Sequence, residues 1–166
     1  MRLTAKTDYA VRACLELTVR ADQGFVKAEE LADAQGIPAA FVLGILNQLK
    51  RAALVESKRG LDGGYRLAMP ADQISVADVL RAVDGPLTSL QGEKVENADY
   101  SGSATYLLHV WVALRTAMRS VLEVTTLADV ASGNLPPNVQ ELLASKGAWV
   151  TRPSGLDVVL EAWDES

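Results

Sequence analysis

Apolar and polar residues over the first 85 positions follow the 3.6-residue period of amphipathic helices, with one interruption near residue 60. The pattern predicts four helices, over residues 7–20, 28–35, 38–53 and 75–85. Gly36 is expected to cap the second helix in the left-handed conformation. Pro38 can occupy the first position of the third helix, because its missing N–H would be unpaired there anyway. Ser75 and Asp78 have the spacing of a capping box for the fourth.

The interruption predicts a β-hairpin. Residues 54–58 and 65–67 are candidate strands on either side of Arg59-Gly-Leu-Asp-Gly-Gly64, whose three glycines allow a loop with positive φ. Phe25-Val26 could add a short strand. We therefore expect a mainly α chain with a small β-hairpin, an α+β arrangement. A helix followed by a basic hairpin is how some proteins place one element in a DNA groove and another on the phosphates.

The third helix divides into two faces when its residues are sorted at about 100° per position. The expected core face consists of Val42, Ile45, Leu46, Leu49 and Ala53. The adjoining arc consists mostly of small residues, together with a few that have polar ends to their side chains. Its members are Ala39, Ala40, Leu43, Gly44, Asn47, Lys50 and Arg51. Such a surface could approach the floor of a DNA groove closely. An apolar face is also expected on the first helix, at Val11, Cys14 and Leu15.

The helical pattern is lost over residues 86–102, which predicts a linker or sensing loop. A long helix is expected next, over about 103–124, with a coiled-coil seam at Leu107, Trp111, Leu114, Met118 and Val121. This spacing suits a partner helix better than a small core. Thr126 and Asp129 then predict a short capped helix that ends at Gly133. Residues 134–166 are expected to form a tail with short helices.

Charge is distributed unevenly along the chain. Residues 1–70 hold ten Lys/Arg and eight Asp/Glu, whereas residues 71–166 hold six and thirteen, so balances of +2 and −7 give the net −5. Between positions 44 and 70 there are five basic residues and two acidic ones. A basic surface is therefore expected only around the third helix and the hairpin, and the carboxyl-terminal half is not expected to touch nucleic acid.

Composition adds three expectations. Apolar residues make up 49% and aromatic residues 5%, so the core should be mostly Ala, Val and Leu. No stretch approaches the roughly 18–20 apolar residues of a membrane span, and the first residues lack the apolar run of a signal peptide. The single cysteine, Cys14, excludes an internal disulfide and is expected to be a buried apolar residue. A cytoplasmic protein with no membrane partner is predicted.

A series of short motifs resembles the BadM/Rrf2 family of bacterial winged-helix transcription regulators. Singly these motifs are weak, but their order and spacing are specific, and the resemblance covers about residues 1–133. They are Leu3-Thr-Ala-Lys-Thr-Asp-Tyr-Ala10, Glu30-Leu-Ala32, Gly36-Ile-Pro38, Ile45-Leu46, Leu49, Leu54-Val55, Ser57, Arg59-Gly60, Gly63-Gly-Tyr65, Ala82-Val-Asp-Gly85 and Thr125-Thr-Leu-Ala-Asp129.

The resemblance implies a winged helix-turn-helix domain over 1–85 and a dimerisation region over 103–133. The third helix would enter the major groove, and Arg59-Gly60 of the hairpin, the wing, would reach the adjacent minor groove. Lys50 stands where related proteins tend to carry a basic DNA-contacting residue. The candidate DNA-binding residues are Ala39, Ala40, Leu43, Asn47, Lys50, Arg51, Lys58, Arg59 and Gly60, with Arg66 as a further phosphate contact.

The chain also departs from this family. Cluster-bearing members have three cysteines between the fourth helix and the long helix, and residues 85–108 contain none. An iron–sulfur cluster of that type is therefore not expected. No other cofactor and no metal is predicted. Leu43 and Gly44 stand where relatives often have longer polar side chains, and Ala53 replaces a common glycine. No nucleophile with a base and orienter is evident, so an enzyme is not predicted.

The prediction is a homodimeric DNA-binding regulator, most often a repressor, of a pseudo-palindromic operator. Two alternatives stay open on the sequence. One is a winged-helix protein-interaction module that regulates through a partner enzyme. The other is a direct small-molecule sensor with a pocket between the long helix and the winged domain, in which Trp111 is a candidate lining residue.

Overall fold

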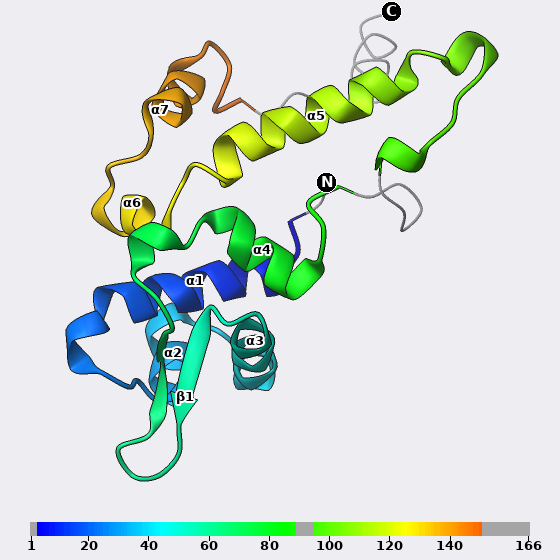
Figure 1. Cartoon of the computed structure of the whole chain (residues 1–166). Coiled ribbons are helices and arrows are strands. Elements are labelled where there is room, and N and C mark those ends of the chain that lie inside the picture. Colours follow the sequence, from blue (N-terminus) through cyan, green and yellow to red (C-terminus); the bar gives the residue numbers. More distant parts are fainter. Residues whose placement is uncertain (1–2, 89–94, 151–166) are drawn as a thin grey trace, which may run out of the picture. The chain divides into compact units, whose positions relative to one another are not determined.

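The computed structural model describes residues 3–88 and 95–150, in a first unit that ends at Pro136 and a second that begins at Pro137 (Figure 1). The mainly helical architecture with one antiparallel hairpin is confirmed. The elements are α1 Ala5–Val19, α2 Ala28–Gln35, α3 Ala39–Arg51, β1 Val55–Lys58, β2 Gly64–Leu67, α4 Val76–Asp84, α5 Leu107–Leu122, α6 Leu127–Ser132 and α7 Pro137–Ala144.

Helix α1 is the centre of the first unit, in contact with α2, α3, α4 and α6. It begins two residues earlier than predicted, because the Thr4 side chain accepts a hydrogen bond from the Thr7 backbone N–H at 3.1 Å. The predicted apolar face was too narrow: Val11 and Leu15 are only half-buried, and Cys14 is fully buried. Neighbours on several sides of α1 also bury Ala10, Ala13 and Leu17.

The helix-turn-helix is formed by α2, Gly36 and α3. Gly36 has φ 59° and ψ 37°, which confirms the left-handed cap. Pro38 lies one position before the helix rather than in it, because its ψ of 131° is extended. Four of the five predicted core residues of α3 are buried: Val42, Ile45, Leu46 and Leu49. The assignment of Ala53 was wrong, because α3 ends at Arg51 and Ala53 is exposed with φ 58°.

The wing consists of β1 and β2, paired from Val55↔Leu67 to Lys58↔Gly64. The predicted third strand is reduced to one residue: Val26 forms a two-hydrogen-bond bridge with Tyr65, at 2.9 and 2.8 Å, and Phe25 does not pair. Gly64 is needed at this junction. Gly64 has φ 154°, and a Cβ added to it would lie 2.4 Å from the Val26 carbonyl oxygen.

Helices α4 and α6 are joined by backbone pairing. Both predicted capping boxes are present, at Ser75/Asp78 and Thr126/Asp129. Ser75 and Thr126 form a β-bridge, and the Leu127 N–H donates to the Ile74 carbonyl at 2.9 Å. The pairing places Leu127 in the core of the winged domain, with no exposed surface.

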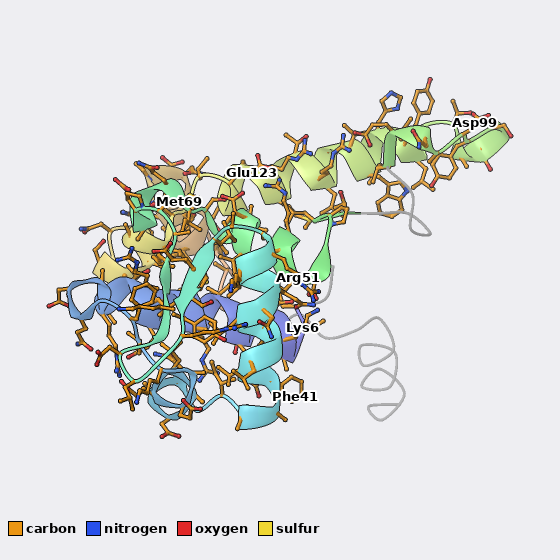
Figure 2. All side chains as sticks on the ribbon, turned by 60° about the horizontal axis from the view of Figure 1, so that its bottom comes forward. Lys6, Phe41, Arg51, Met69, Asp99 and Glu123 are labelled. Carbon is orange, nitrogen blue, oxygen red and sulfur yellow. The ribbon has the colours of Figure 1, made fainter. Side chains whose placement is uncertain are left out.

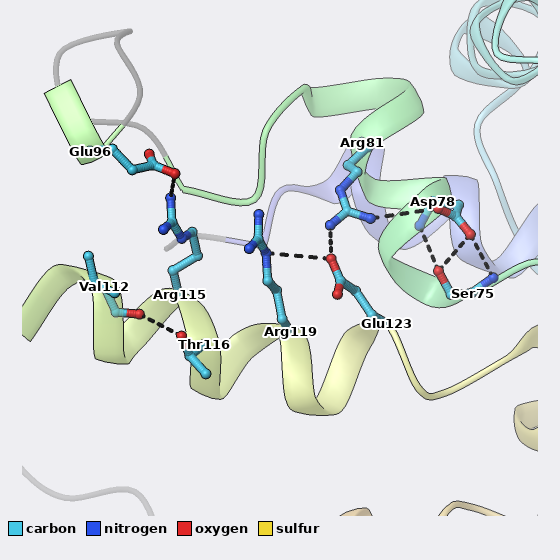
Figure 3. Close-up of polar contacts among 9 residues, drawn as sticks. All are labelled: Ser75, Asp78, Arg81, Glu96, Val112, Arg115, Thr116, Arg119 and Glu123. Atoms are coloured by element: carbon cyan, nitrogen blue, oxygen red, sulfur yellow. Dashed lines mark hydrogen bonds and ion pairs between the residues drawn. The ribbon is translucent and has the colours of Figure 1, made fainter.

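Ion pairs add to this junction at the end of α5 (Figure 3). Arg81 of α4 pairs with Glu123, just after α5, and lies 3.6 Å from Asp78. Arg119 of α5 approaches the same Glu123 carboxylate at 3.5 Å. The carboxyl-terminal end of α5 is thereby linked to the winged domain. These groups are about 36–48% exposed, so each pair stabilises the link only modestly.

Helix α5 contains no fully buried residue. It starts at Leu107 rather than 103, because Gly102–Ala104 forms a short 3₁₀ turn. One face is half-buried against residues that precede the helix: the Trp111 Nε1–H donates to the Tyr100 hydroxyl at 3.2 Å, and Arg115 pairs with Glu96 at 2.5 Å. The expected linker 86–102 is therefore packed in part, and Val95 within it is 2% exposed. Residues 89–94 of that segment lie outside the described part.

The second unit contains α7, where the Trp149 Nε1–H donates to the Leu143 carbonyl at 3.1 Å. Residues 151–166 of the predicted tail are outside the described part of the chain. None of the helices in the described ranges combines the length and the apolar character that crossing a lipid bilayer requires.

Candidate nucleic-acid interface

All nine candidate DNA-binding residues are exposed, on α3 and on the wing. On α3 the side chains of Asn47, Lys50 and Arg51 are exposed, outside the face formed by the buried residues. Figure 2 shows the whole length of this helix, from Phe41 near its start to Arg51 at its end. A Cβ added to Gly44 would meet nothing within 4 Å, so the middle of this surface is open to an approaching molecule. Leu43 is 50% exposed on the same surface.

A hydrogen bond connects α3 to the wing. The Lys50 ammonium donates to the Ser57 hydroxyl of β1 at 2.6 Å. This contact brings the last turn of the helix and the first strand of the hairpin to one place, so their positive charges form a single surface. Sequence periodicity could not reveal it, because it compares positions within one element.

Phe25 lies close to two cations of the wing strands. Its ring centroid lies 4.7 Å from the Arg66 guanidinium carbon and 6.0 Å from the Lys58 ammonium. Arg66 also pairs with Glu56, its neighbour across the hairpin. Its charge is therefore compensated within the wing, which argues against the phosphate contact that we expected from Arg66.

The start of α3 carries an aromatic cluster that the sequence patterns missed. Phe41, 46% exposed, packs edge-on against Tyr9 of α1 with ring centroids 5.8 Å apart. The Arg12 guanidinium lies 5.6 Å from the Tyr9 centroid and 3.2 Å from Asp8. An exposed phenylalanine in the first turn of a surface helix was the available signal. Its partner could be found only from the crossing of α1 and α3.

The five candidate dimerisation residues lie along α5 but differ in exposure. Leu107, Trp111, Met118 and Val121 are half-buried, whereas Leu114 is 45% exposed. The uncovered part of the helix surface also includes Val110, which is 55% exposed, and Tyr106 just before the helix, at 76%. An apolar strip therefore runs beside the half-buried face of α5.

The chain is similar to several known regulators. It is 53% identical over 142 residues to a Mycobacterium tuberculosis protein named as an HTH-type transcriptional regulator, covering 86% of this chain and 88% of that one. It is 35% identical over 145 residues to the HTH-type transcriptional regulator IscR of Photobacterium profundum, covering 86% of this chain and 80% of that one.

Solved structures of other regulators share its fold, including the following two. The structure of CymR, the global cysteine regulator of B. subtilis, matches 81% of this chain and 98% of its own length, with TM-score 0.67 and 28% identity. The structure of T. potens IscR matches 91% of this chain and 97% of its own length, with TM-score 0.63 and 26% identity.

The family model that matches residues 3–133 is that of Rrf2, described as an iron-dependent transcriptional regulator. The described residues of this chain do not fit an iron site. Among residues 3–88 and 95–150, no group of three or more His, Cys, Asp or Glu could hold a metal ion. Burial raises the pKa of the Cys14 thiol to about 12, so the thiolate that ligates metals is disfavoured. The one histidine, His109, is exposed on α5.

The relatives and structural neighbours named above are regulators rather than enzymes. Together with the fold and the exposed basic surface, these similarities identify the family. The chain belongs to the Rrf2 family of transcriptional regulators and has their winged-helix fold.

Proposed function

We propose that the protein is a homodimeric transcriptional repressor that binds a pseudo-palindromic operator, with α3 in the major groove and the wing in the minor groove. The observation that supports this best is the exposed basic surface formed by Lys50, Arg51, Lys58 and Arg59 in an otherwise acidic chain. The Lys50–Ser57 hydrogen bond joins the helical and the wing parts of that surface. Cations so arranged attract DNA phosphates, and their effect weakens as salt concentration rises.

The two elements make unequal contributions in this proposal. The exposed side of α3 offers few groups that read bases: Asn47 can pair with adenine, whereas Ala39, Ala40 and Gly44 can only bring the backbone close. Lys50 and Arg51 serve mainly as phosphate contacts. Specificity then rests on Arg59, which is exposed on the wing beside Gly60. A narrow A·T-rich minor groove has the negative potential that attracts an arginine.

The homodimer forms through α5. Its uncovered apolar strip at Val110 and Leu114, next to half-buried Trp111 and Met118, is the surface that a second copy of the helix would cover. Such a dimer would hold two recognition helices about 34 Å apart, the spacing of successive major grooves on one face of DNA. The regulator would act in the cytoplasm, where its operator is, and without an iron–sulfur cluster. A small molecule or a partner protein would supply the signal.

The proposal can be tested by selecting operator DNA from a random pool and measuring its affinity by fluorescence anisotropy. We expect Arg59→Ala to weaken operator binding about ten-fold or more and to weaken binding to unrelated DNA much less. Lys50→Ala should weaken both kinds of DNA similarly and reduce the salt slope by about one. Lys146→Ala, in the second unit, is the matched control and should change neither.

Two results would contradict the proposal. If no sequence is enriched from the random pool, the alternative of a protein-interaction module is favoured. If Arg59→Ala weakens all DNA equally, the wing does not discriminate and specificity must come from α3.

A further inference from the structure

Leu61 lies in the loop of the wing and is 91% exposed, the highest value among the large apolar side chains of the described residues. An apolar side chain so exposed contributes almost nothing to the stability of the fold. Its neighbours are the exposed Gly60 and Asp62. Figure 1 shows the hairpin projecting beyond the helices, with this loop at its far end.

The loop holds Leu61 in a defined place. The Gly63 N–H donates to the Gly60 carbonyl at 3.0 Å, which closes a turn with Leu61 and Asp62 at its two central positions. Gly63 is buried beneath them, and a Cβ there would lie 2.4 Å from the Lys58 carbonyl oxygen. The turn is therefore packed at its base, and only its central side chains face outward.

The charges around the turn argue for DNA bases as the partner of Leu61. Lys58 and Arg59 precede the turn and attract phosphates, so they would bring the loop to the duplex. Asp62, the other central residue of the turn, is repelled by phosphates, so of these two side chains only that of Leu61 can gain from contact with the duplex. An apolar contact with bases is the favourable interaction that remains for Leu61.

We propose that Leu61 inserts between two base pairs in the minor groove, beside the site of Arg59, and kinks the operator there. Apolar side chains used in this way partly unstack one base step and bend DNA by about 20–90° toward the major groove. Pyrimidine–purine steps such as TA and CA/TG unstack most easily. Leu61 would therefore select a flexible step at a fixed distance from the bases under α3. The inference rests on the proposed placement of the wing in the minor groove.

The experiment measures affinity and DNA bend angle together, using the operator selected by the wild-type protein and energy transfer between dyes on the duplex ends. Leu61→Ala should reduce the bend by about 20° or more and the affinity about ten-fold, because three side-chain carbons lose their contact. Leu61→Met keeps an apolar side chain of similar size and should stay within about three-fold of wild type. Val19→Ala, which removes apolar atoms from another exposed side chain far from the wing in sequence, should change neither quantity.

A second arm changes the DNA. Replacing the flexible step under the wing by AA should weaken wild-type binding and should have little effect on Leu61→Ala. This difference would not arise if Leu61 only stabilised the loop, because a loop defect would be independent of the base step.

The outcomes separate this inference from the proposed function. If Leu61→Ala binds and bends DNA like wild type while Arg59→Ala weakens operator binding, the wing lies on DNA but Leu61 is not a wedge. If neither variant has an effect, the placement of the wing itself is wrong. A change in sedimentation mass without a change in bend angle would show that Leu61 contacts a second copy instead, and would also overturn the inference.

Discussion

Helices α3 and α5 are both amphipathic, yet α3 buries four residues completely and α5 buries none. Helix α3 packs against α1, α2, α4 and β1, all within one chain. Within the described residues, the main neighbours of α5 are α4 and the 3₁₀ turn Val95–Asn97. Among the described residues, the winged domain therefore provides the neighbours that bury one face of α3, whereas every residue of α5 stays half-buried or exposed.

The division between these regions does not follow the order of the chain. Leu127, which comes after α5, is completely buried in the core of the winged domain. The Ser75–Thr126 bridge and the Arg81–Glu123 ion pair hold the end of α5 to α4. In the proposed dimer, a change in how two α5 helices meet would reach the winged domain through this junction.

The largest expected effect is on the uncovered strip of α5. Leu114→Glu should raise the dimer dissociation constant at least about 100-fold, because two like charges would be placed in the contact between identical helices. Sedimentation equilibrium measures this change. Thr116→Glu, on the polar side of the same helix, is the control and should keep the dimer. An unchanged mass for Leu114→Glu would show that α5 is covered in some other way.

The next largest effect is expected on the free energy of unfolding, when Leu127 in the core of the winged domain is compared with Leu114 on α5. Leu127→Ala should lower the free energy of unfolding by about 2–5 kcal/mol, because it leaves a cavity among fully packed neighbours. The effect of Leu114→Ala on a monomeric background, such as one also carrying Val110→Glu, should be below about 1 kcal/mol. Urea denaturation gives both values. Equal losses of unfolding free energy at Leu127 and Leu114 would show that the two side chains are equally well packed within one chain, which would contradict the comparison.

A smaller effect should appear at the contact between α1 and α4. The Thr7 hydroxyl donates to the Asp84 carboxylate and, with Lys6 beside it at 3.2 Å, holds the pKa of Asp84 below its usual range. Because the folded pKa is lowered, this stabilisation is fully present above the unfolded value of about 3.9 and is lost as pH falls through the folded pKa.

Asp84→Asn should therefore destabilise the protein by about 1 kcal/mol at pH 7, discounted for partial exposure, and by less in acid. Thermal unfolding at several pH values measures the difference from wild type. Asp22→Asn, in the exposed turn after α1, is the matched control. A difference independent of pH would mean that the charge of Asp84 is not what matters.

The smallest expected effect is a gain in stability at Ala53, just after α3. Ala53 has φ 58°, a conformation that costs an alanine about 1–2 kcal/mol and a glycine little. After the greater flexibility of glycine in the unfolded chain is included, Ala53→Gly should stabilise the winged domain by about 0.5–1 kcal/mol. Ala52→Gly, where φ is −82°, should destabilise it slightly. A loss of stability in Ala53→Gly would contradict this account, and differential scanning calorimetry can detect either sign.

Much of the winged domain could be predicted, because its signals are local. The caps at Gly36, Ser75 and Thr126 were found from one or two residues each, and the core face of α3 from its period. Errors arose where a neighbour in space decides the outcome. Ala53 continues the apolar pattern of α3, but the chain must turn there to begin β1, and the helix ends before it.

For the candidate DNA interface, the sequence predicted a set of residues, and the structure adds contacts among them that the sequence did not predict. Lys50, Arg51, Lys58 and Arg59 were identified from charge and position, and all are exposed. The pairing of Arg66 with Glu56 and Phe25 was missed, because cross-strand register and the approach of a distant loop are not visible in composition.

The sequence by itself determined the order and approximate positions of the helices, the caps at Gly36, Ser75 and Thr126, the basic segment between residues 44 and 70 and the absence of clustered cysteines. These depend on residue type and near neighbours, and therefore need no knowledge of the fold. Only the tertiary structure decided that Lys50 reaches Ser57, that Leu127 belongs to the core of the winged domain, and that residues 3–88 and 95–150 leave part of α5 exposed. The physical reason is that burial and pairing depend on which surfaces meet, and those surfaces come from segments far apart in the chain.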